Sequence, residues 1–474
     1  MSVTPCPTEA NPTTPTAGTW ALTCLALVML LSSLGTSIAN IALPTLVDAF
    51  DTTFRAVQWV VLAYLLAVTT VVVSVGRLGD LIGRRRLMIT GIGLFTVASI
   101  ACATAPELWM LVGARALQGL GAAVMMALAM ALVGDSVPKQ HAGRAMGFLG
   151  TMSAVGTALG PSLGGGLVLL WDWPAIFLIN MPLGLLALLL ATRYLPADVS
   201  SRDRPSLDIP GSVVLAITLA AYAIAMTQGR GALNNTGTAL LCLAAVGAFV
   251  FVAIESKARS PLIRPQLFRR RLVATGFAMS VLVTTVVMTT LVVGPFYLTG
   301  ALGLSPAAAG AVMTAGPLVA ALVGVPAGRG VDHFGAHRVT VTALIAMVVG
   351  TVSLTLLPAS LGAVGYVLPL ITLTAGFAAF QVANNAAVVT GVEANDRGVV
   401  SGLLNLARNL GLITGASVMG TVFAAAVGEP GVAAAGALAI ANGMHTAFAA
   451  GAMLVGVALL LAVGMARPSP SPTV

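Results

Sequence analysis

The sequence predicts an all-α polytopic membrane protein with fourteen transmembrane helices. Apolar residues make up 58% of the 474-residue chain, whereas Lys, Arg, Asp and Glu together make up only 8%. A soluble domain carries about 25% charged residues, so this composition excludes a soluble enzyme, a disordered scaffold and a disulfide-built secreted domain. Because a helix needs about 20 apolar residues to cross the hydrocarbon core, fourteen spans would take up most of the chain.

Fourteen long apolar segments carry this prediction. A segment of such length satisfies all of its backbone hydrogen bonds internally only as a helix, which excludes the alternating strands of a membrane β-barrel. The predicted spans are 20–43, 57–76, 87–105, 108–134, 145–170, 175–194, 209–227, 238–254, 272–299, 307–327, 339–357, 363–389, 399–427 and 443–465.

An internal duplication relates the two halves of the chain. The segment GRLGDLIG at 76–83 matches GRGVDHFG at 328–335, at an offset of 252 residues. The glycines at positions 147, 156, 160 and 165 recur at 402, 411, 415 and 420, at an offset of 255 residues. Such repeats commonly enclose a substrate site near the bilayer midplane, which opens to either side as the two halves rock.

We therefore expect five parts along the chain. The first nineteen residues are rich in Pro and Thr and lack Lys and Arg, unlike a signal peptide. The parts are a disordered cytoplasmic tail, 1–19; an N-terminal six-helix bundle, 20–194; a linker with two extra transmembrane helices, 195–271; a C-terminal six-helix bundle, 272–465; and a second cytoplasmic tail, 466–474.

The distribution of positive charge predicts the orientation. Nineteen of the 23 Lys and Arg residues fall in loops that share one side of the membrane, whereas only Arg55 and Arg230 fall in loops on the other side. Cytoplasmic loops carry such an excess, so both termini are expected in the cytoplasm. The net charge of +8 is then explained by this orientation and by attraction of the positive loops to anionic lipid headgroups. It requires no nucleic-acid partner.

The loop after the second span combines glycines with charges at a distinctive spacing. The glycines allow close helix contact, and the acid and arginines can make charge-assisted bonds to a neighbouring helix end in one conformation only. A plain cluster of positive charges would explain the arginines, but not the Gly and Asp spacing or its second copy. The candidate conformational latch consists of Gly76, Asp80, Gly83, Arg84 and Asp332.

Arg115 and Gln118 lie in the predicted fourth span. An arginine within hydrocarbon is costly and indicates a function by default. The alternative is a structural arginine that binds backbone carbonyls of the first helix.

Glycines and a proline dominate the predicted fifth span. Small residues give a helix a smooth, closely packed face, and proline removes a backbone hydrogen bond and bends the helix. The second copy has Ala416 and Met419 in place of Pro161 and Gly164, so the bend is expected in the first copy alone. Ordinary small-residue packing is the alternative interpretation of the set Gly147, Gly156, Gly160, Pro161, Gly164 and Gly165.

Polar residues on two apolar spans predict a cavity. Unpaired amide side chains cost several kcal/mol in lipid, so these residues are expected to face protein or water. Two interpretations are equally supported: the residues line a substrate route, or they form hydrogen bonds between helices. The candidates are Thr36, Ser37 and Asn40 on the first span, Gln381, Asn384 and Asn385 on the twelfth, and Arg408 on the thirteenth.

These motifs together resemble the major facilitator superfamily. The loop at 76–86 resembles its loop signature, the segment LVGARALQGLGAA at 111–123 resembles a second signature, and the fifth-span pattern resembles its antiporter signature. Fourteen spans, with TSIANIALP at 36–44, IFLINMPLG at 176–184 and NLARNLG at 405–411, are similar to the fourteen-span drug:proton antiporter branch.

The resemblance implies a major facilitator fold in a bacterial inner membrane. It further implies export of small amphiphilic, drug-like or antibiotic-like compounds by proton antiport and alternating access, with Arg115 tied to proton movement. Two positions depart from the branch pattern. Gly35 stands where an Asp is usual in the first span, and Pro174 stands where an Arg is common.

The absence of the first-span acid affects the expected substrate. None of the fifteen Asp and Glu residues falls at mid-membrane depth, whereas Arg115 and Arg408 do. A buried carboxylate is the usual proton carrier and the usual partner of a lipophilic cation. The sequence therefore favours a neutral or anionic substrate, with the proton bound at Asp48 or Glu107 near the outer mouth or carried by the substrate.

No cofactor, metal or nucleotide is expected. The chain has no G-x-x-x-x-G-K-[ST] segment, which disfavours ATP-driven transport, and its four Cys residues have no metal or disulfide spacing. As a transporter, the chain is expected not to be an enzyme. Two alternatives to an exporter remain open. One is an importer or lipid-precursor flippase of the same fold, and the other is a non-transporting membrane sensor.

Overall fold

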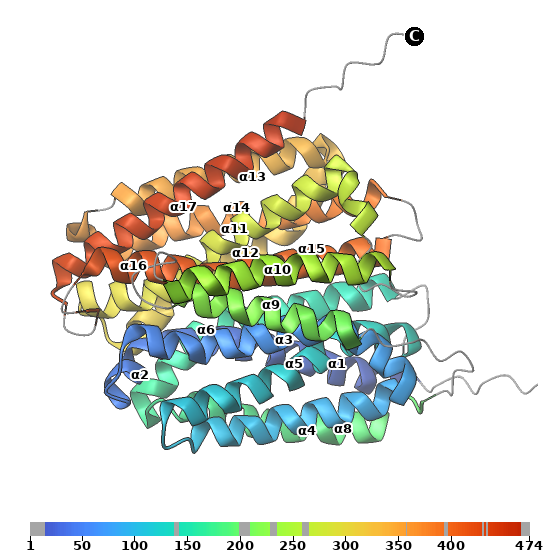
Figure 1. Ribbon diagram of the computed structural model, residues 1–474. Helices are drawn as coiled ribbons and strands as arrows, with labels where there is room; N and C mark the ends of the chain where they lie inside the picture. Colours follow the sequence, from blue (N-terminus) through green and yellow to red (C-terminus); the bar gives the residue numbers. More distant parts are fainter. Residues whose placement is uncertain are drawn as a thin grey trace, which may run out of the picture.

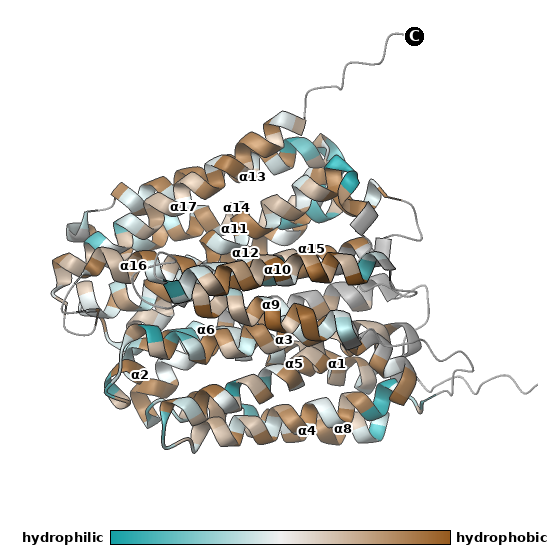
Figure 2. Cartoon of the chain, viewed as in Figure 1, coloured by the Kyte–Doolittle hydropathy of each residue, from teal (hydrophilic) through white to brown (hydrophobic). Residues whose placement is uncertain are grey.

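The computed structural model describes residues 15–136, 142–198, 209–227, 235–257, 265–356, 358–392, 397–428, 431–432 and 435–465. The residues in these ranges form helices joined by short turns, and the longer helices run roughly side by side (Figure 1). Apolar residues cover the length of the helices, and hydrophilic residues gather near the ends of several of them (Figure 2). This agrees with the predicted all-α class.

The first group of helices packs together as one bundle, drawn in blue through teal to light green in the lower part of Figure 1. Its helices are α1 (Pro15–Ile41), α2 (Leu43–Ala49), α3 (Phe54–Ile82), α4 (Arg84–Ala103), α5 (Leu108–Ser136), α6 (Ala142–Trp171), α7 (Ala175–Leu178) and α8 (Asn180–Tyr194). Helix α1 begins five residues before the predicted first span, so residues 15–19 of the expected tail are helical.

The second group forms a second bundle, and two further helices, α9 (Ile209–Thr227) and α10 (Asn235–Lys257), lie between the groups in the view of Figure 1. The second bundle follows the short 3₁₀ helix η3 (Pro265–Arg269) and comprises α11 (Arg271–Phe296), η4 (Tyr297–Ala301), α12 (Pro306–Phe334), α13 (Ala336–Leu356), η5 (Ala359–Leu361), α14 (Gly362–Thr390), α15 (Arg397–Thr414), η7 (Gly415–Met419), α16 (Gly420–Val427) and α17 (Ala437–Met465). The expected tail 466–474 lies outside the described residues.

Twelve helical segments in the described ranges are long and apolar enough to cross a membrane, against the fourteen predicted. The two predicted spans without such a segment, 145–170 and 209–227, fall on α6 and α9. These helices contribute the shorter apolar stretches Val155–Trp171 and Pro210–Ala225.

The duplication extends to the helix boundaries. Helices α3 and α12 each have 29 residues and begin 252 residues apart, and each follows a hydroxyl side chain that caps its first turn. These caps are Thr53, whose Oγ1 accepts a hydrogen bond from Ala56 N, and Ser305, whose Oγ accepts one from Ala308 N. Helices α6 and α15 likewise begin 255 residues apart. Equivalent positions in the two halves can therefore be compared directly.

The second copy is not a regular α-helix where the first copy carries Pro161. Between α15 and α16 the chain forms the π-helix η7, which spans Gly415–Met419 and includes Ala416, the position equivalent to Pro161. Each copy thus interrupts the regular hydrogen-bond pattern at the same place, the first with a proline and the second with a wider turn.

Candidate functional site

Arg115 is fully buried, with 0% of its surface exposed, and binds groups on three helices. Its Nε donates a hydrogen bond of 2.9 Å to the carbonyl of Val60 on α3, and its Nη2 donates one of 3.1 Å to the carbonyl of Gly35 on α1. Its Nη1 donates to Oε1 of Gln118, one turn along α5, at 2.5 Å. All of these acceptors are neutral oxygens.

The network extends from the guanidinium to further elements. Gln118 Nε2 donates a hydrogen bond of 2.7 Å to the hydroxyl of Ser99 on α4. The guanidinium lies 4.3 Å from the ring centroid of Tyr64 and 5.8 Å from that of Phe177 on α7, where cation–π attraction is favourable. This arrangement matches the structural alternative for Arg115, because the side chain holds the first bundle together. Its role in proton movement stays a prediction.

Of the two departures from the branch pattern, Gly35 binds Arg115 through its carbonyl, and Pro174 lies three residues before Phe177. A Cβ atom added at Gly35 would lie 3.1 Å from the Tyr64 hydroxyl oxygen and 3.4 Å from the Phe95 ring, so a larger residue fits only if these rings move slightly. Pro174 precedes the first residue of α7, the short helix that carries Phe177.

Three glycines of the fifth-span pattern face α1. A Cβ atom added at Gly156 would overlap the carbonyl of Leu30, and one added at Gly160 would overlap the hydroxyl of Ser37. Gly164 lies against the next turn of α1. Because they lack side chains, these residues let the backbones of α1 and α6 approach closely.

Two other members of the pattern face the second bundle. The carbonyl of Pro161 lies directly against Gly310 of α12, and Gly165 lies against the carbonyl of Pro306, the first residue of α12. The surroundings of Gly147 fall outside what the structure describes. The pattern thus serves packing on both faces of α6, and its link to antiport remains a prediction.

A buried glutamine and three aromatic rings make further contacts between the bundles. Gln58 Nε2 on α3 donates a hydrogen bond of 2.9 Å to the carbonyl of Ala416 in η7. Phe54 on α3 packs edge-on against Phe296 and Phe423 of the second bundle, with ring centroids 4.8 and 5.6 Å apart. The sequence analysis missed these contacts. The available signal was Gln58 itself, an amide side chain in a largely apolar predicted span.

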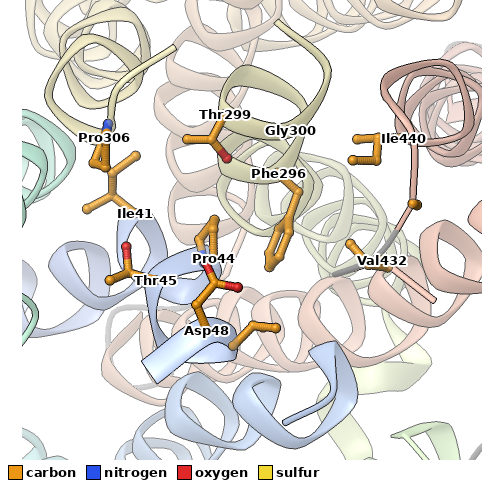
Figure 3. Close-up of a pocket in the computed structure, with 12 residues that line it drawn as sticks. Ile41, Pro44, Thr45, Asp48, Phe296, Thr299, Gly300, Pro306, Val432 and Ile440 are labelled. Atoms are coloured by element: carbon orange, nitrogen blue, oxygen red, sulfur yellow. The ribbon is translucent and has the colours of Figure 1, made fainter. Parts of the chain in front are cut away.

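A cavity of about 300 Å³ lies between the bundles at the end of the molecule that carries α2, here called the α2 end (Figure 3). Ile41 and Asp48 line one side of it, and Phe296, Thr299 and Ile440 line the other. Asp48 is the only charged side chain among the described residues that line it. The predicted cavity residues do not line this space.

The first-span candidates make local bonds and one contact with α6. Ser37 is buried, and its Oγ lies 3.4 Å from the carbonyl of Gly156, to which it can donate. Asn40 is also buried; its Nδ2 donates to the carbonyl of Thr36 at 3.0 Å, while its Oδ1 has no partner among the described residues. Half-buried Thr36 donates to the carbonyl of Ser32.

The second-bundle candidates separate into two kinds. Asn384 is buried and bonds between helices, because its Nδ2 donates to the Ser280 hydroxyl of α11 at 2.9 Å. Gln381 is half-buried and Asn385 is exposed. Arg408 is half-buried, and its Nε has no hydrogen-bond partner among the described residues. Asn384 and Ser37 thus favour the hydrogen-bonding interpretation, whereas Asn40 and Arg408 keep unpaired polar atoms.

An acid outside the predicted latch caps the helix that follows the latch loop. The backbone N–H groups of Arg85 and Arg86 donate to the two carboxylate oxygens of Asp198, at 2.7 and 3.3 Å. The Arg85 guanidinium also donates to the carbonyl of Thr192 in the last turn of α8. Gly83, with a φ of 106°, turns the chain beside this carboxylate, and a Cβ atom there would overlap it.

The other predicted latch residues occupy the ends of helices. Arg84 is the first residue of α4, and Asp332 is exposed in the last turn of α12. Gly76 and Asp80 lie in α3, but the side-chain surroundings of these two positions fall outside what the structure describes. Among the described side chains, the acid that binds the start of α4 is therefore Asp198, which was not among the predicted latch residues.

The described residues contain no group of three or more His, Cys, Asp or Glu side chains placed to hold a metal ion.

The sequence model of the Major Facilitator Superfamily matches residues 25–416. The chain belongs to this superfamily. It is 32% identical over 83% of its length to the riboflavin transporter RibZ of Clostridioides difficile, and covers 86% of that protein. It is 30% identical over 88% of its length to the multidrug efflux pump LfrA of Mycolicibacterium smegmatis, and covers 83% of that protein.

The fold agrees with this membership. A bacterial homologue of the human lysosomal transporter Spinster, in an inward-facing and unoccupied conformation, superimposes with a TM-score of 0.70 at 15% identity, over 97% of this chain and 100% of that one. The chain is therefore an integral membrane protein of a transporter family, and its relatives include multidrug efflux pumps.

Proposed function

We propose that the protein exports small amphiphilic, drug-like compounds across a bacterial inner membrane by proton-coupled antiport. The chain crosses the membrane fourteen times, with α6 and α9 as the two additional spans and with both termini in the cytoplasm. The α2 end then faces outward. Similarity to a multidrug efflux pump over most of the chain supports this proposal.

The contacts between the bundles support transport by alternating access. Those made by Gln58 and Phe54 lie close to the α2 end, next to the cavity that contains Asp48. In the proposed orientation, these contacts close the outer side of the transporter. Export requires that these contacts break, so that the opposite end closes while the α2 end opens.

The charges inside the bundles carry the proposal for the substrate class. Arg115 donates its described hydrogen bonds to neutral oxygens only. The Nε of Arg408 has no hydrogen-bond partner among the described residues. Neither positive charge is therefore paired with a carboxylate in the bonds described. A lipophilic cation entering this interior meets repulsion, whereas an anionic or neutral compound does not. The preferred substrates are therefore neutral or anionic.

Flux measurements test this function. The protein is reconstituted in liposomes with an imposed pH gradient, and an internal pH dye is followed while anionic, neutral and cationic amphiphiles are added in turn. Protein-free liposomes and ionophore-treated liposomes are the controls. Release of the gradient by anionic or neutral compounds supports the proposal. Release by quaternary ammonium compounds alone contradicts the preferred charge.

The second candidate function is an importer of the same fold, and the similarity to a riboflavin transporter makes riboflavin the compound to test. The liposome experiment distinguishes the two when riboflavin is included. Accumulation of riboflavin inside vesicles in which the protein has its cytoplasmic face inward supports import, whereas loss of preloaded compound from such vesicles supports export.

A further inference from the structure

Two contacts between the bundles involve equivalent positions of the duplication. At the first, the carbonyl of Pro161 on α6 lies against Gly310 of α12. At the second, the carbonyl of Ala416 in η7 accepts a hydrogen bond of 2.9 Å from Gln58 on α3. Ala416 lies 255 residues after Pro161, and Gly310 lies 252 residues after Gln58. The two contacts are therefore equivalent under the duplication. In each one, a backbone carbonyl of one bundle contacts the corresponding helix position of the other bundle.

The first of these contacts is made by backbone alone. A Cβ atom at Gly310 would overlap the Pro161 carbonyl, and one at Gly165 would overlap the carbonyl of Pro306. The helices touch through paired glycines on opposite elements, and among the described residues no side-chain hydrogen bond joins them at these positions. Such a joint is held by van der Waals packing, which tolerates small rotations but offers no single bond to break.

The second contact depends on a side chain. Gln58 is only 1% exposed, and its Nε2 supplies the hydrogen bond, while its Oε1 has no partner among the described residues. Gly420, one turn after Ala416, makes room for the amide, because a Cβ atom there would overlap Nε2.

The acceptor of this bond lies in an irregular turn. The π-helix η7 shifts the backbone bonds from i→i−4 to i→i−5, so the turn is wider and a carbonyl within it is open to another donor. Regular α-helix would restore the ordinary partner of that carbonyl once Gln58 leaves. The structure shows this carbonyl bound to Gln58 Nε2, whereas a regular α-helix would offer it a backbone donor instead.

We propose that Gln58 and η7 form the latch of the α2 end, whereas the symmetry-related contact between α6 and α12 is a packing joint without such a latch. This inference rests on the proposed alternating-access function. It gives unequal roles to the two symmetry-related contacts, Pro161–Gly310 and Gln58–Ala416. Gln58 is a positioning residue: it does not touch the substrate but holds the closed state through the Ala416 carbonyl.

A single buried hydrogen bond between neutral groups shifts a two-state equilibrium by about 3- to 10-fold. Loss of the latch is expected to raise the fraction of molecules open at the α2 end by that factor. The distance between labels at Ala49 and Leu438 reports this opening, because both residues are exposed at the α2 end and belong to different bundles.

The experiment compares variants of the full chain in lipid nanodiscs, with spin labels on cysteines introduced by Ala49→Cys and Leu438→Cys. The background carries Cys6→Ser and Cys242→Ser, because Cys242 is exposed, whereas Cys24 and Cys102 are buried. Gln58→Leu removes the donor. Gly420→Ala displaces the amide while it keeps the glutamine. Gly456→Ala, at a position with no atom within 4 Å of the added Cβ, is the matched control.

Both latch variants are expected to increase the population of long label distances about 3- to 10-fold, whereas Gly456→Ala leaves the distribution unchanged. An unchanged distribution in either latch variant, with the protein still folded by circular dichroism, overturns the proposal. If Gln58→Leu does not fold, Gly420→Ala alone decides. The readout needs no substrate, so a shifted distribution in a protein without measurable flux supports the latch while the proposed export fails.

Discussion

The Nη2 of Arg115 donates a hydrogen bond of 3.1 Å to the carbonyl of Gly35 and thereby joins α5 to α1. This places the positive charge beside the residue that replaces the usual first-span acid. The guanidinium donates to backbone and amide oxygens and not to a carboxylate. Its N–H groups therefore have hydrogen-bond acceptors, but none of the bonds described brings a negative charge to balance its positive charge. Two of the predictions below concern this pair.

Substitution Arg115→Ala is expected to destabilise the protein by about 2–4 kcal/mol, because several buried hydrogen bonds are lost together and Gln118 Oε1 loses its donor. Denaturant unfolding in mixed micelles measures this change. The control Arg338→Ala removes an exposed arginine and is expected to change stability by less than about 0.5 kcal/mol. Normal stability together with lost proton flux in Arg115→Ala would show that Arg115 acts in transport and not in packing.

Substitution Gly35→Asp tests the argument on substrate charge. The new carboxylate enters a narrow space beside the Tyr64 hydroxyl, near the Arg115 guanidinium, and lowers the positive potential of the interior. Export of a quaternary ammonium compound, measured in liposomes, is expected to appear or to increase. Gly35→Asn has nearly the same shape without the charge and is the control. An equal gain in both variants would contradict the electrostatic explanation.

Substitution Gly156→Ala is expected to cost about 1–3 kcal/mol, because the added methyl group overlaps the carbonyl of Leu30 and forces α1 and α6 apart. Gly166→Ala in the same helix is the matched control, since no atom lies within 4 Å of the added Cβ. Unfolding midpoints of the two variants are compared. Equal midpoints would show that the close contact between α1 and α6 contributes little to stability.

Substitution Asp198→Ala is expected to destabilise the first turn of α4 by about 1 kcal/mol, because the carboxylate satisfies two N–H groups at the helix start. Hydrogen exchange at Arg85 and Arg86 measures the loss of protection. Asp198→Asn retains an oxygen acceptor and is expected to keep most of the protection. Unchanged exchange in Asp198→Ala would mean that other groups cap α4.

Much of the fold follows from local sequence features. Apolar length alone places the helices, since charges are too rare inside the spans to interrupt them. The duplication motif at 76–83 and 328–335 also marks two real turns, because Gly83 and Gly335 both adopt positive φ between consecutive helices. Left-handed backbone of this kind favours glycine, so the repeated glycine carries direct structural information.

Contacts between distant segments were harder to predict. Gln58 and Ala416 are 358 residues apart, and no local pattern indicates that they meet. The π-helix at Gly415–Met419 contains no proline to interrupt the α-helix, so its wider turn depends on the packing around it. Asp198 was likewise missed, because an exposed acid after a helix is common and its capping role depends on where α4 begins.

The partner of α4 also constrains how the protein is made. Asp198 lies 113 residues beyond Arg85, after α8 has ended. During synthesis the start of α4 therefore remains uncapped by this carboxylate until the ribosome has produced the whole first bundle. The contact can form only once residues 180–198 have been synthesised, so it ties the start of α4 to the last part of the first bundle.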